Sequence, residues 1–176
     1  MKLNSDTNNK HSEPQEFSAE TMLKVDSLIA QYPEGKHKSA LIAILHIAQE
    51  ERGWLSIETM NYVASLLKIK PIEVYEVATF YTMFHISPVG KYVLEVCRTG
   101  PCMLVGSDEI IAYIESKLNI KVGENTEDGL FTLKTVECMG ACGYGPMLQC
   151  KRKNYEHLTF EKVDELIENL KNGIHG

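Results

Sequence analysis

The 176-residue sequence lacks any apolar run of the roughly 20 residues that a membrane-spanning helix needs. Its first 16 residues are polar, contain Asp6, Glu13 and Glu16, and include no arginine. This composition excludes a secretory signal peptide and argues against a mitochondrial presequence. We therefore expect a disordered tail over residues 1–16 and a soluble protein that stays in the compartment where it is made. In such a compartment thiols are normally kept reduced.

The sequence also lacks the features of several functional classes. Its net charge of −6 is evenly divided, because residues 1–90 hold 8 basic and 11 acidic residues and residues 91–176 hold 10 and 13. No basic half therefore suggests a nucleic-acid-binding domain. Glycine-rich loops of the G-x-G-x-x-G or G-x-x-x-x-G-K-[ST] type are missing, so we expect the chain to bind neither NADH nor flavin through such a loop. We identify no catalytic triad and no paired carboxylates, and we predict no catalytic residues.

What the sequence does contain is a globular composition, 44% hydrophobic and 24% charged. Over residues 17–86, apolar residues recur at helical spacing in four segments, which predicts a helical bundle. Pro33 ends the first segment, and Gly53 follows the second. Ser56 caps the third, and Pro71 begins the fourth. The side chains expected to face the core are Met22, Val25, Ile29, Tyr32, Leu41, Ile44, Leu45, Ala48, Met60, Val63, Ala64, Leu67, Val74, Val77, Ala78 and Tyr81.

The pattern changes at the turn-rich junction of residues 87–90. After it, β-rich segments predict strands over 91–97, 131–136, 147–150 and 155–158, with a turn over 151–154. Two helices are also expected, one capped by Ser107 or Asp108 and one capped by Thr159. The order β-α-β-β-β-α predicts an α/β (α+β) domain over residues 87–176, in which two helices pack the sheet.

Four of the five cysteines form two short pairs in glycine-rich loops at the ends of predicted strands. Four residues separate Cys97 from Cys102, three separate Cys138 from Cys142, and 35 residues lie between the pairs. Four thiolates on such loops, in reducing surroundings, indicate a metal centre rather than disulfides. No C-x-x-C motif is present, so thioredoxin-type dithiol chemistry is not expected.

The cysteine spacing leaves three interpretations open. Structural zinc usually uses knuckles with two residues between ligands, which neither pair has. Two disulfides or buried inert thiols are a second possibility, although such thiols seldom fall on two glycine-rich loops. A 2Fe-2S cluster is the third and the favoured one, because each pair can hold its own iron and wider gaps are tolerated. The glycines that could then take positive φ and direct N–H groups at sulfur are Gly100, Gly140, Gly143 and Gly145.

Longer motifs carry a resemblance to a known family. They are A-T-F-Y-T-M-F at 78–84, P-V-G-K-Y at 88–92, C-R-T-G-P-C at 97–102, D-G-L-F-T-L at 128–133 and E-C-M-G-A-C-G-Y-G-P-M at 137–147. The helical segment at 38–56 matches as well. With these motifs, residues 17–172 resemble the E-type, thioredoxin-like 2Fe-2S subunit of the NADH dehydrogenase module of respiratory complex I.

The resemblance implies a fold and a cofactor. Residues 17–86 would form a helical bundle, and residues 87–176 a thioredoxin-like 2Fe-2S ferredoxin domain. Each chain would bind one 2Fe-2S cluster, whereas FMN and NADH would be bound only by a partner subunit. The cluster ligands that the resemblance implies are Cys97, Cys102, Cys138 and Cys142.

The resemblance also implies a function and partners. The chain would be an electron-transfer subunit of NADH:quinone oxidoreductase, exchanging single electrons with the flavin of the NADH-oxidising subunit. It would have no substrate-converting site of its own, and would contact further peripheral-arm subunits without binding nucleic acid or inserting into the membrane. In a bacterium it would lie at the cytoplasmic face of the inner membrane. The alternatives are the homologous subunit of an NAD-linked hydrogenase or formate dehydrogenase, and a zinc-stabilised interaction module.

The sequence departs from the family pattern at three places. Gly145 stands where alanine is expected before Pro146. Cys150 stands where an aliphatic residue is usual, and we expect it to be a small core residue rather than a ligand. The basic tip K-R-K at 151–153 replaces an often acidic turn and is expected to be solvated.

Overall fold

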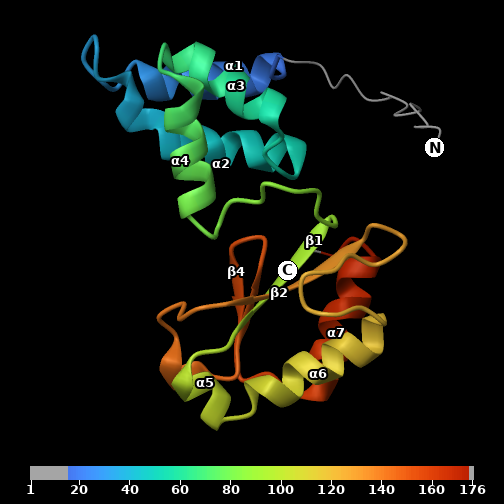
Figure 1. The fold of residues 1–176 in the computed structure, drawn as a ribbon. Helices are drawn as coiled ribbons and strands as arrows, with labels where there is room; N and C mark the ends of the chain where they lie inside the picture. Colours follow the sequence, from blue (N-terminus) through green and yellow to red (C-terminus); the bar gives the residue numbers. More distant parts are fainter. Residues whose placement is uncertain (1–15, 175–176) are drawn as a thin grey trace, which may run out of the picture. The chain divides into compact units, whose positions relative to one another are not determined.

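The computed structural model describes residues 16–174, so the predicted disordered tail lies outside the described residues except for Glu16. The chain divides into two compact units, with the boundary between Ser87 and Pro88, and each unit is described by itself (Figure 1). None of the helices in residues 16–174 has the length and apolar character required to cross a bilayer.

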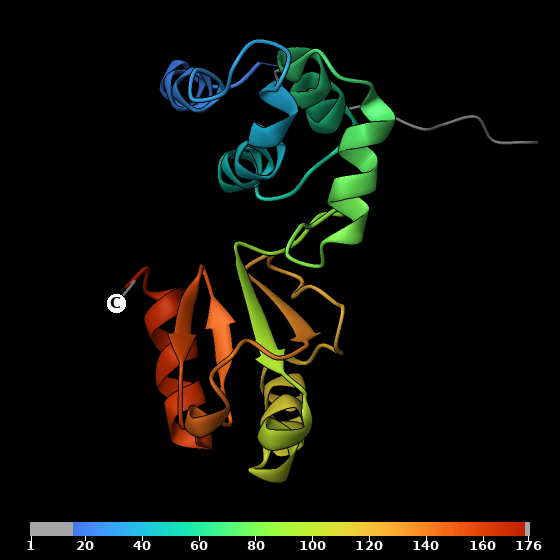
Figure 2. The same cartoon turned by 90° about the vertical axis from the view of Figure 1, so that its left-hand side faces the viewer.

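The first unit consists of four α-helices and one 3-10 turn (Figure 2). They are α1 (Ala19–Ile29), η1 (His37–Ala40), α2 (Leu41–Arg52), α3 (Ile57–Leu67) and α4 (Pro71–Phe80). The predicted caps are present: the Ser56 hydroxyl accepts a hydrogen bond from the Thr59 N–H, and Gly53 takes a φ of 82° just past α2. Pro71 occupies the first turn of α4, where its missing N–H costs nothing.

The apolar stripes of the four helices form one buried core, as the periodicity predicts. Two predicted positions differ. Tyr32 lies beyond α1, which ends at Ile29, although it still packs partly against the core. Tyr81 was expected inside but caps the C-terminus of α4 and is 39% exposed. The inward position predicted for Tyr81 is wrong because α4 ends at Phe80. The backbone of Tyr81 is extended, and its side chain turns away from the core.

The second unit combines a four-stranded sheet with helices (Figure 1). Its elements are β1 (Tyr92–Cys97), α5 (Gly100–Leu104), α6 (Ser107–Leu118), β2 (Phe131–Val136), η2 (Cys142–Tyr144), β3 (Leu148–Cys150), β4 (Lys153–Tyr155) and α7 (Phe160–Lys171). The strand order is β2-β1-β3-β4. Strands β1 and β2 are parallel, whereas β3 pairs antiparallel with both β1 and β4.

The core of this unit lies between one face of the sheet and the helices α6 and α7, which contact each other. Alternate residues of β1, namely Tyr92, Leu94 and Val96, are buried there. This arrangement, together with the helical first unit, confirms the mixed helix-and-sheet fold class and the packing of the sheet by two helices.

Three details of the second unit differ from the prediction. The five-residue helix α5 was not expected, because it is too short to show a helical period and contains a Gly-Pro pair that favours a turn. Helix α6 has Gly106, with a φ of 100°, as its N-cap, so Ser107 is the first helical residue rather than the cap. Strand β4 spans Lys153–Tyr155 instead of 155–158. Lys151 and Arg152, both with positive φ, form a two-residue turn that returns the chain earlier.

Candidate metal centre

The first cysteine pair is buried where β1 passes into α5. Cys97 is the last residue of β1, and its N–H donates to the Met147 carbonyl at 3.1 Å. Thr99 precedes α5, and its hydroxyl oxygen lies 3.3 Å from the Cys97 sulfur. Cys102, on α5, is buried, and it packs together with Cys97 and the buried Met147 side chain. A strand end followed at once by a short helix thus brings two cysteines with four residues between them into a compact pair.

The second cysteine pair is exposed and lies on the loop after β2. The sulfurs of Cys138 and Cys142 are 3.6 Å apart. A tetrahedral metal with metal–sulfur bonds of about 2.3 Å holds two of its sulfurs about 3.8 Å apart, so this pair could chelate one metal. Gly140, between them, has a φ of 79° and donates its N–H to the Cys138 sulfur at 3.4 Å.

The parallel pairing of β1 with β2 brings the two loops together. Cys97 is opposite Val136 in the register, and the Arg98 N–H donates to the Val136 carbonyl at 3.0 Å. The carboxyl ends of both strands therefore lie at the same end of the sheet, and Cys138 follows Val136 by two residues. Thr99 lies between the two loops, because its hydroxyl is 3.3 Å from the Cys97 sulfur and also contributes to lowering the pKa of Cys138.

Hydrogen bonds divide the buried pair into an acceptor and a donor. Burial raises the pKa of Cys97, but bonds from the Thr99 hydroxyl and N–H, the Cys102 thiol and the Met139 N–H bring it below the usual value. Burial raises the pKa of Cys102 to about 11, with a further contribution from the bond it donates to Cys97. The Met147 N–H opposes this rise by donating to the Cys102 sulfur.

The exposed pair repeats the division. The Gly140 N–H, followed by the Cys142 thiol, lowers the pKa of Cys138. The bond that Cys142 donates to Cys138 raises the pKa of Cys142. Each pair therefore offers one sulfur stabilised as thiolate and one thiol directed at it, and a metal that replaces the shared proton would be bound by both sulfurs.

Only one of the four glycines expected to take positive φ does so. That glycine is Gly140; the other three, Gly100, Gly143 and Gly145, do not. Gly145 is constrained by space instead. A Cβ atom there would lie 3.0 Å from Val105 Cγ2 and 3.3 Å from the Cys102 sulfur. The sequence predicts a turn at Gly145, but it does not show that the backbone passes this close to Cys102.

Cys150 lies apart from the two pairs. It is 2% exposed and belongs to the core between the sheet, α6 and α7. Burial raises its pKa to about 11. Its predicted place as a small core residue is confirmed.

The residues of the two pairs fit an iron–sulfur cluster. Such a cluster takes two thiolates on each of two irons, and the chain supplies two chelating pairs from adjoining loops. The N–H groups of Met139, Gly140 and Met147 point at the sulfurs, where they offset the negative charge of the cluster. Sequence reasoning missed Thr99, Met139 and Met147. Met139 and Met147 act through backbone N–H groups, which side-chain type does not reveal, and the Thr99 hydroxyl acts only because the fold places it beside the Cys97 sulfur. Within residues 16–174, no three His, Cys, Asp or Glu side chains are grouped around a position for a single metal ion.

Comparison with known families agrees with the donor set. The model of the thioredoxin-like [2Fe-2S] ferredoxin family matches residues 25–171, which is most of the chain. The chain belongs to this family. The resemblance and the thioredoxin-like fold inferred from the motifs are thereby confirmed, and the cofactor of this thioredoxin-like [2Fe-2S] ferredoxin is a 2Fe-2S cluster.

Relatives of this thioredoxin-like [2Fe-2S] ferredoxin include a subunit of NADH-quinone oxidoreductase and an NADH dehydrogenase flavoprotein. It is 43% identical over 157 residues to the E subunit of NADH-quinone oxidoreductase from Rickettsia conorii, covering 89% of this chain and 94% of that protein. It is also 43% identical over 171 residues to the mitochondrial NADH dehydrogenase [ubiquinone] flavoprotein 2 of Dictyostelium discoideum, covering 97% of this chain and 69% of that protein.

A solved structure shares the fold. A chain of an NAD+-reducing [NiFe]-hydrogenase superposes with a TM-score of 0.68 at 20% identity. The match covers 77% of this thioredoxin-like [2Fe-2S] ferredoxin but only 23% of the hydrogenase chain. At this identity the likeness concerns the fold alone.

Proposed function

We propose that this chain is the electron-transfer subunit of an NADH:quinone oxidoreductase that corresponds to the E subunit of its Rickettsia relative. The observation that carries the proposal is the meeting of two cysteine pairs at the carboxyl ends of β1 and β2, in a member of the thioredoxin-like [2Fe-2S] ferredoxin family. The 43% identity to that relative, over 94% of its length, supports the same assignment. The proposed ligands of the one cluster in the chain are Cys97, Cys102, Cys138 and Cys142.

When bound, a 2Fe-2S cluster accepts and returns one electron at a time. The chain's own residues would hold it on an anchored side and an open side. Cys97 and Cys102 fix the buried side, because β1 and α5 position both sulfurs. Cys138 and Cys142 hold the exposed side, where an electron donor can approach. The Gly140 and Met147 N–H groups, which act on the Cys138 and Cys102 sulfurs, would offset the negative charge of a bound cluster.

The proposed partner is the flavin-bearing, NADH-binding subunit of the same enzyme, and further peripheral-arm subunits would contact the chain. The relatives are named subunits of multi-subunit enzymes, which supports a partnered role. FMN and NADH would be bound by the partner, and this chain would store a single electron beside the flavin. We propose residues 17–86 as the main partner-binding domain and residues 87–176 as the cluster domain. In a bacterial host the chain would lie at the cytoplasmic face of the membrane.

A second candidate host is an NAD-linked hydrogenase, with one chain of which this chain shares its fold. The cluster chemistry would be the same there, so the neighbouring subunits distinguish the two. Co-purification with membrane-arm subunits and NADH-dependent quinone reduction would support the oxidoreductase. Co-purification with a nickel–iron subunit would replace it by the hydrogenase.

The central experiment is low-temperature EPR of the anaerobically purified chain, before and after dithionite, with iron and sulfide analysis. We expect a signal that appears only on reduction, with two irons and two sulfides per chain, because a 2Fe-2S cluster becomes paramagnetic when it takes up one electron. Zinc in place of iron after anaerobic cluster reconstitution would overturn the redox function and leave a colourless interaction module.

A further inference from the structure

The two edges of the sheet in the second unit are treated differently. Beside β2, the chain's own loop covers the edge: the Gly123 N–H donates to the Leu133 carbonyl at 2.8 Å, and the Thr126 N–H donates to the Phe131 carbonyl at 2.9 Å. An isolated bridge between Asn125 and Thr132 continues this cover. The opposite edge is β4, the last strand in the order. An uncovered edge strand presents backbone groups that can pair with another chain.

The turn before β4 determines which backbone groups face outward. Lys151 and Arg152 have φ values of 49° and 63°, as in the two-residue hairpin turn that requires positive φ at both positions. In such a hairpin the flanking residues, here Cys150 and Lys153, form a hydrogen-bonded pair. The next pair, Gln149 and Asn154, is a non-hydrogen-bonded pair. Asn154, opposite Gln149, therefore directs its N–H and C=O away from β3 toward the open edge.

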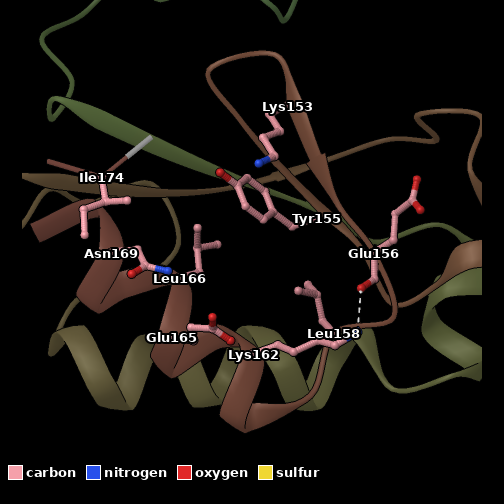
Figure 3. A pocket seen from close by; sticks show the side chains of 9 residues that line it. All are labelled: Lys153, Tyr155, Glu156, Leu158, Lys162, Glu165, Leu166, Asn169 and Ile174. Atoms are coloured by element: carbon pink, nitrogen blue, oxygen red, sulfur yellow. Dashed lines mark hydrogen bonds between the residues drawn. The ribbon is translucent and has the colours of Figure 1, made fainter. Parts of the chain in front are cut away.

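A groove of about 340 Å³ lies beside this edge, between β4 and α7 (Figure 3). Its apolar lining comes from Tyr155, Leu158, Leu166 and Ile174. In the close-up, the Tyr155 ring lies beside Lys153, and the α7 side chains face it from below. Tyr155 and Lys153 point to the helix side of β4, whereas Asn154 does not line the groove. Alternate side chains of a strand added beside β4 would therefore enter the groove.

The charge around the groove indicates what could bind there. Lys153 has its Nζ 5.2 Å from the centre of the Tyr155 ring, and Lys162 Nζ donates to the Glu156 carbonyl at 3.3 Å. The adjoining turn adds Lys151 and Arg152. The groove lining itself holds two lysines, Lys153 and Lys162, and two carboxylates, Glu156 and Glu165, so the excess of positive charge comes from the turn. An acidic segment is therefore favoured, whereas a second copy would bring two basic turns together.

We propose that the β4 edge and this groove bind an extended acidic segment of another protein, which adds to the sheet as a fifth strand and places one apolar side chain in the groove. Backbone pairing with Asn154 would supply affinity, and the groove would select the side chain. None of the groove residues is one of the four cysteines, so this inference does not depend on the proposed redox function.

The test measures binding of a fluorescein-labelled peptide, DEVFVED, to the full chain by fluorescence anisotropy. Its central phenylalanine and the two glutamates share one face, so they can meet the groove and its lysines together. The charge-reversed peptide KRVFVKR should bind at least about tenfold more weakly. Two further peptides are N-methylated on either the odd or the even residues. Only one of them should lose binding, because a strand pairs with β4 through alternate residues.

A matched pair of protein variants tests the same point. Asn154→Pro removes the outward N–H at an edge position, where proline is tolerated. Asn154→Ala keeps that N–H, and both variants lose the 2.8 Å side-chain bond from Gln149. We expect Asn154→Pro to weaken DEVFVED binding at least about tenfold and Asn154→Ala to leave it nearly unchanged. Lys153→Glu, which keeps the backbone intact, should also weaken binding and serves if Asn154→Pro fails to fold.

Three results would overturn the proposal. One is the lack of any anisotropy change up to about 1 mM chain, the weakest affinity that would still be specific here. Another is equal loss of binding with both N-methylated peptides, or with neither, which would indicate a groove that takes a side chain without strand addition. The third is equal binding of the acidic and basic peptides.

Discussion

The two cysteine pairs differ in their exposure at the scale of single residues. Cys97 and Cys102 are buried beside Met147, whereas Cys138 and Cys142 are exposed. A redox centre held by the proposed ligands would be anchored on one side and accessible on the other, so solvent and a redox partner would reach it at the exposed loop.

Replacing any of the four proposed ligands with serine should remove most of the bound iron and sulfide, because a hydroxyl is a harder and poorer ligand for iron–sulfur clusters than a thiolate. The measurement is iron, sulfide and visible absorbance per chain after anaerobic purification. Cys150→Ser is the control: it should keep the cluster while its buried hydroxyl lowers the free energy of unfolding by about 1–3 kcal/mol. The assignment is wrong if Cys150→Ser bleaches the protein and one of the four variants does not.

Gly145→Ala should lower the midpoint potential of the cluster. The added methyl group would lie 3.3 Å from the Cys102 sulfur and would push that sulfur away from the Met147 N–H. A weaker N–H···S bond stabilises the reduced cluster less, by on the order of tens of millivolts. EPR-monitored redox titration measures the shift. Gly143→Ala is the matched control, because a Cβ there meets nothing within 4 Å; an equal shift in both variants would contradict the proposed cause.

At the scale of elements, a polar cluster joins α6 to α7. The Tyr113 hydroxyl donates to Asp164 at 2.7 Å, and Lys117 Nζ lies 2.7 Å from the same oxygen. The Tyr113 ring also stacks on Phe160 at 4.5 Å. These contacts supplement the apolar contacts by which both helices pack the sheet.

This cluster predicts a pH dependence of stability. The bonds from Lys117 and Tyr113 lower the pKa of Asp164, so its stabilising effect is present above the ordinary Asp pKa of about 3.9 and is lost as pH falls through the lowered value. Asp164→Asn should therefore reduce the free energy of unfolding at pH 7 but change it little at pH 2. Urea unfolding of cluster-free chain at both pH values measures this. Tyr113→Phe should reduce the free energy of unfolding at pH 7 by less than Asp164→Asn does, because the bond from Lys117 remains. An equal loss of unfolding free energy at both pH values would contradict the argument.

At the scale of the whole molecule, the chain divides at residues 87 and 88. Deleting residues 1–85 should abolish co-purification with the flavin-bearing subunit, while residues 86–176 keep a cluster with an unchanged EPR signal. Each unit has its own buried core, so the loss of one leaves the other packed. Deleting only residues 1–15 is the control and should leave co-purification intact. Complex formation without residues 1–85 would show that the cluster domain carries the partner surface.

Several features could be predicted from local sequence because local physics decides them. The apolar period gave the four helices of the first unit, and Ser56, Pro71 and Thr159 marked helix starts through their capping chemistry. The second unit was less predictable at its turns. Helix α5 is too short to show a helical period. The start of β4 depends on the positive φ of Lys151 and Arg152, which side-chain type does not reveal.

The sequence by itself determined the fold class, the helical faces and the four thiols, because these follow from periodicity and from residue chemistry. The tertiary structure alone decided that the two pairs meet, since the parallel register of β1 and β2 places the carboxyl ends of both strands side by side. It also decided which N–H groups reach sulfur, how closely Gly145 approaches Cys102, and that β4 is left as an open edge beside a groove. These depend on the spatial proximity of residues far apart in the chain, which no local pattern encodes.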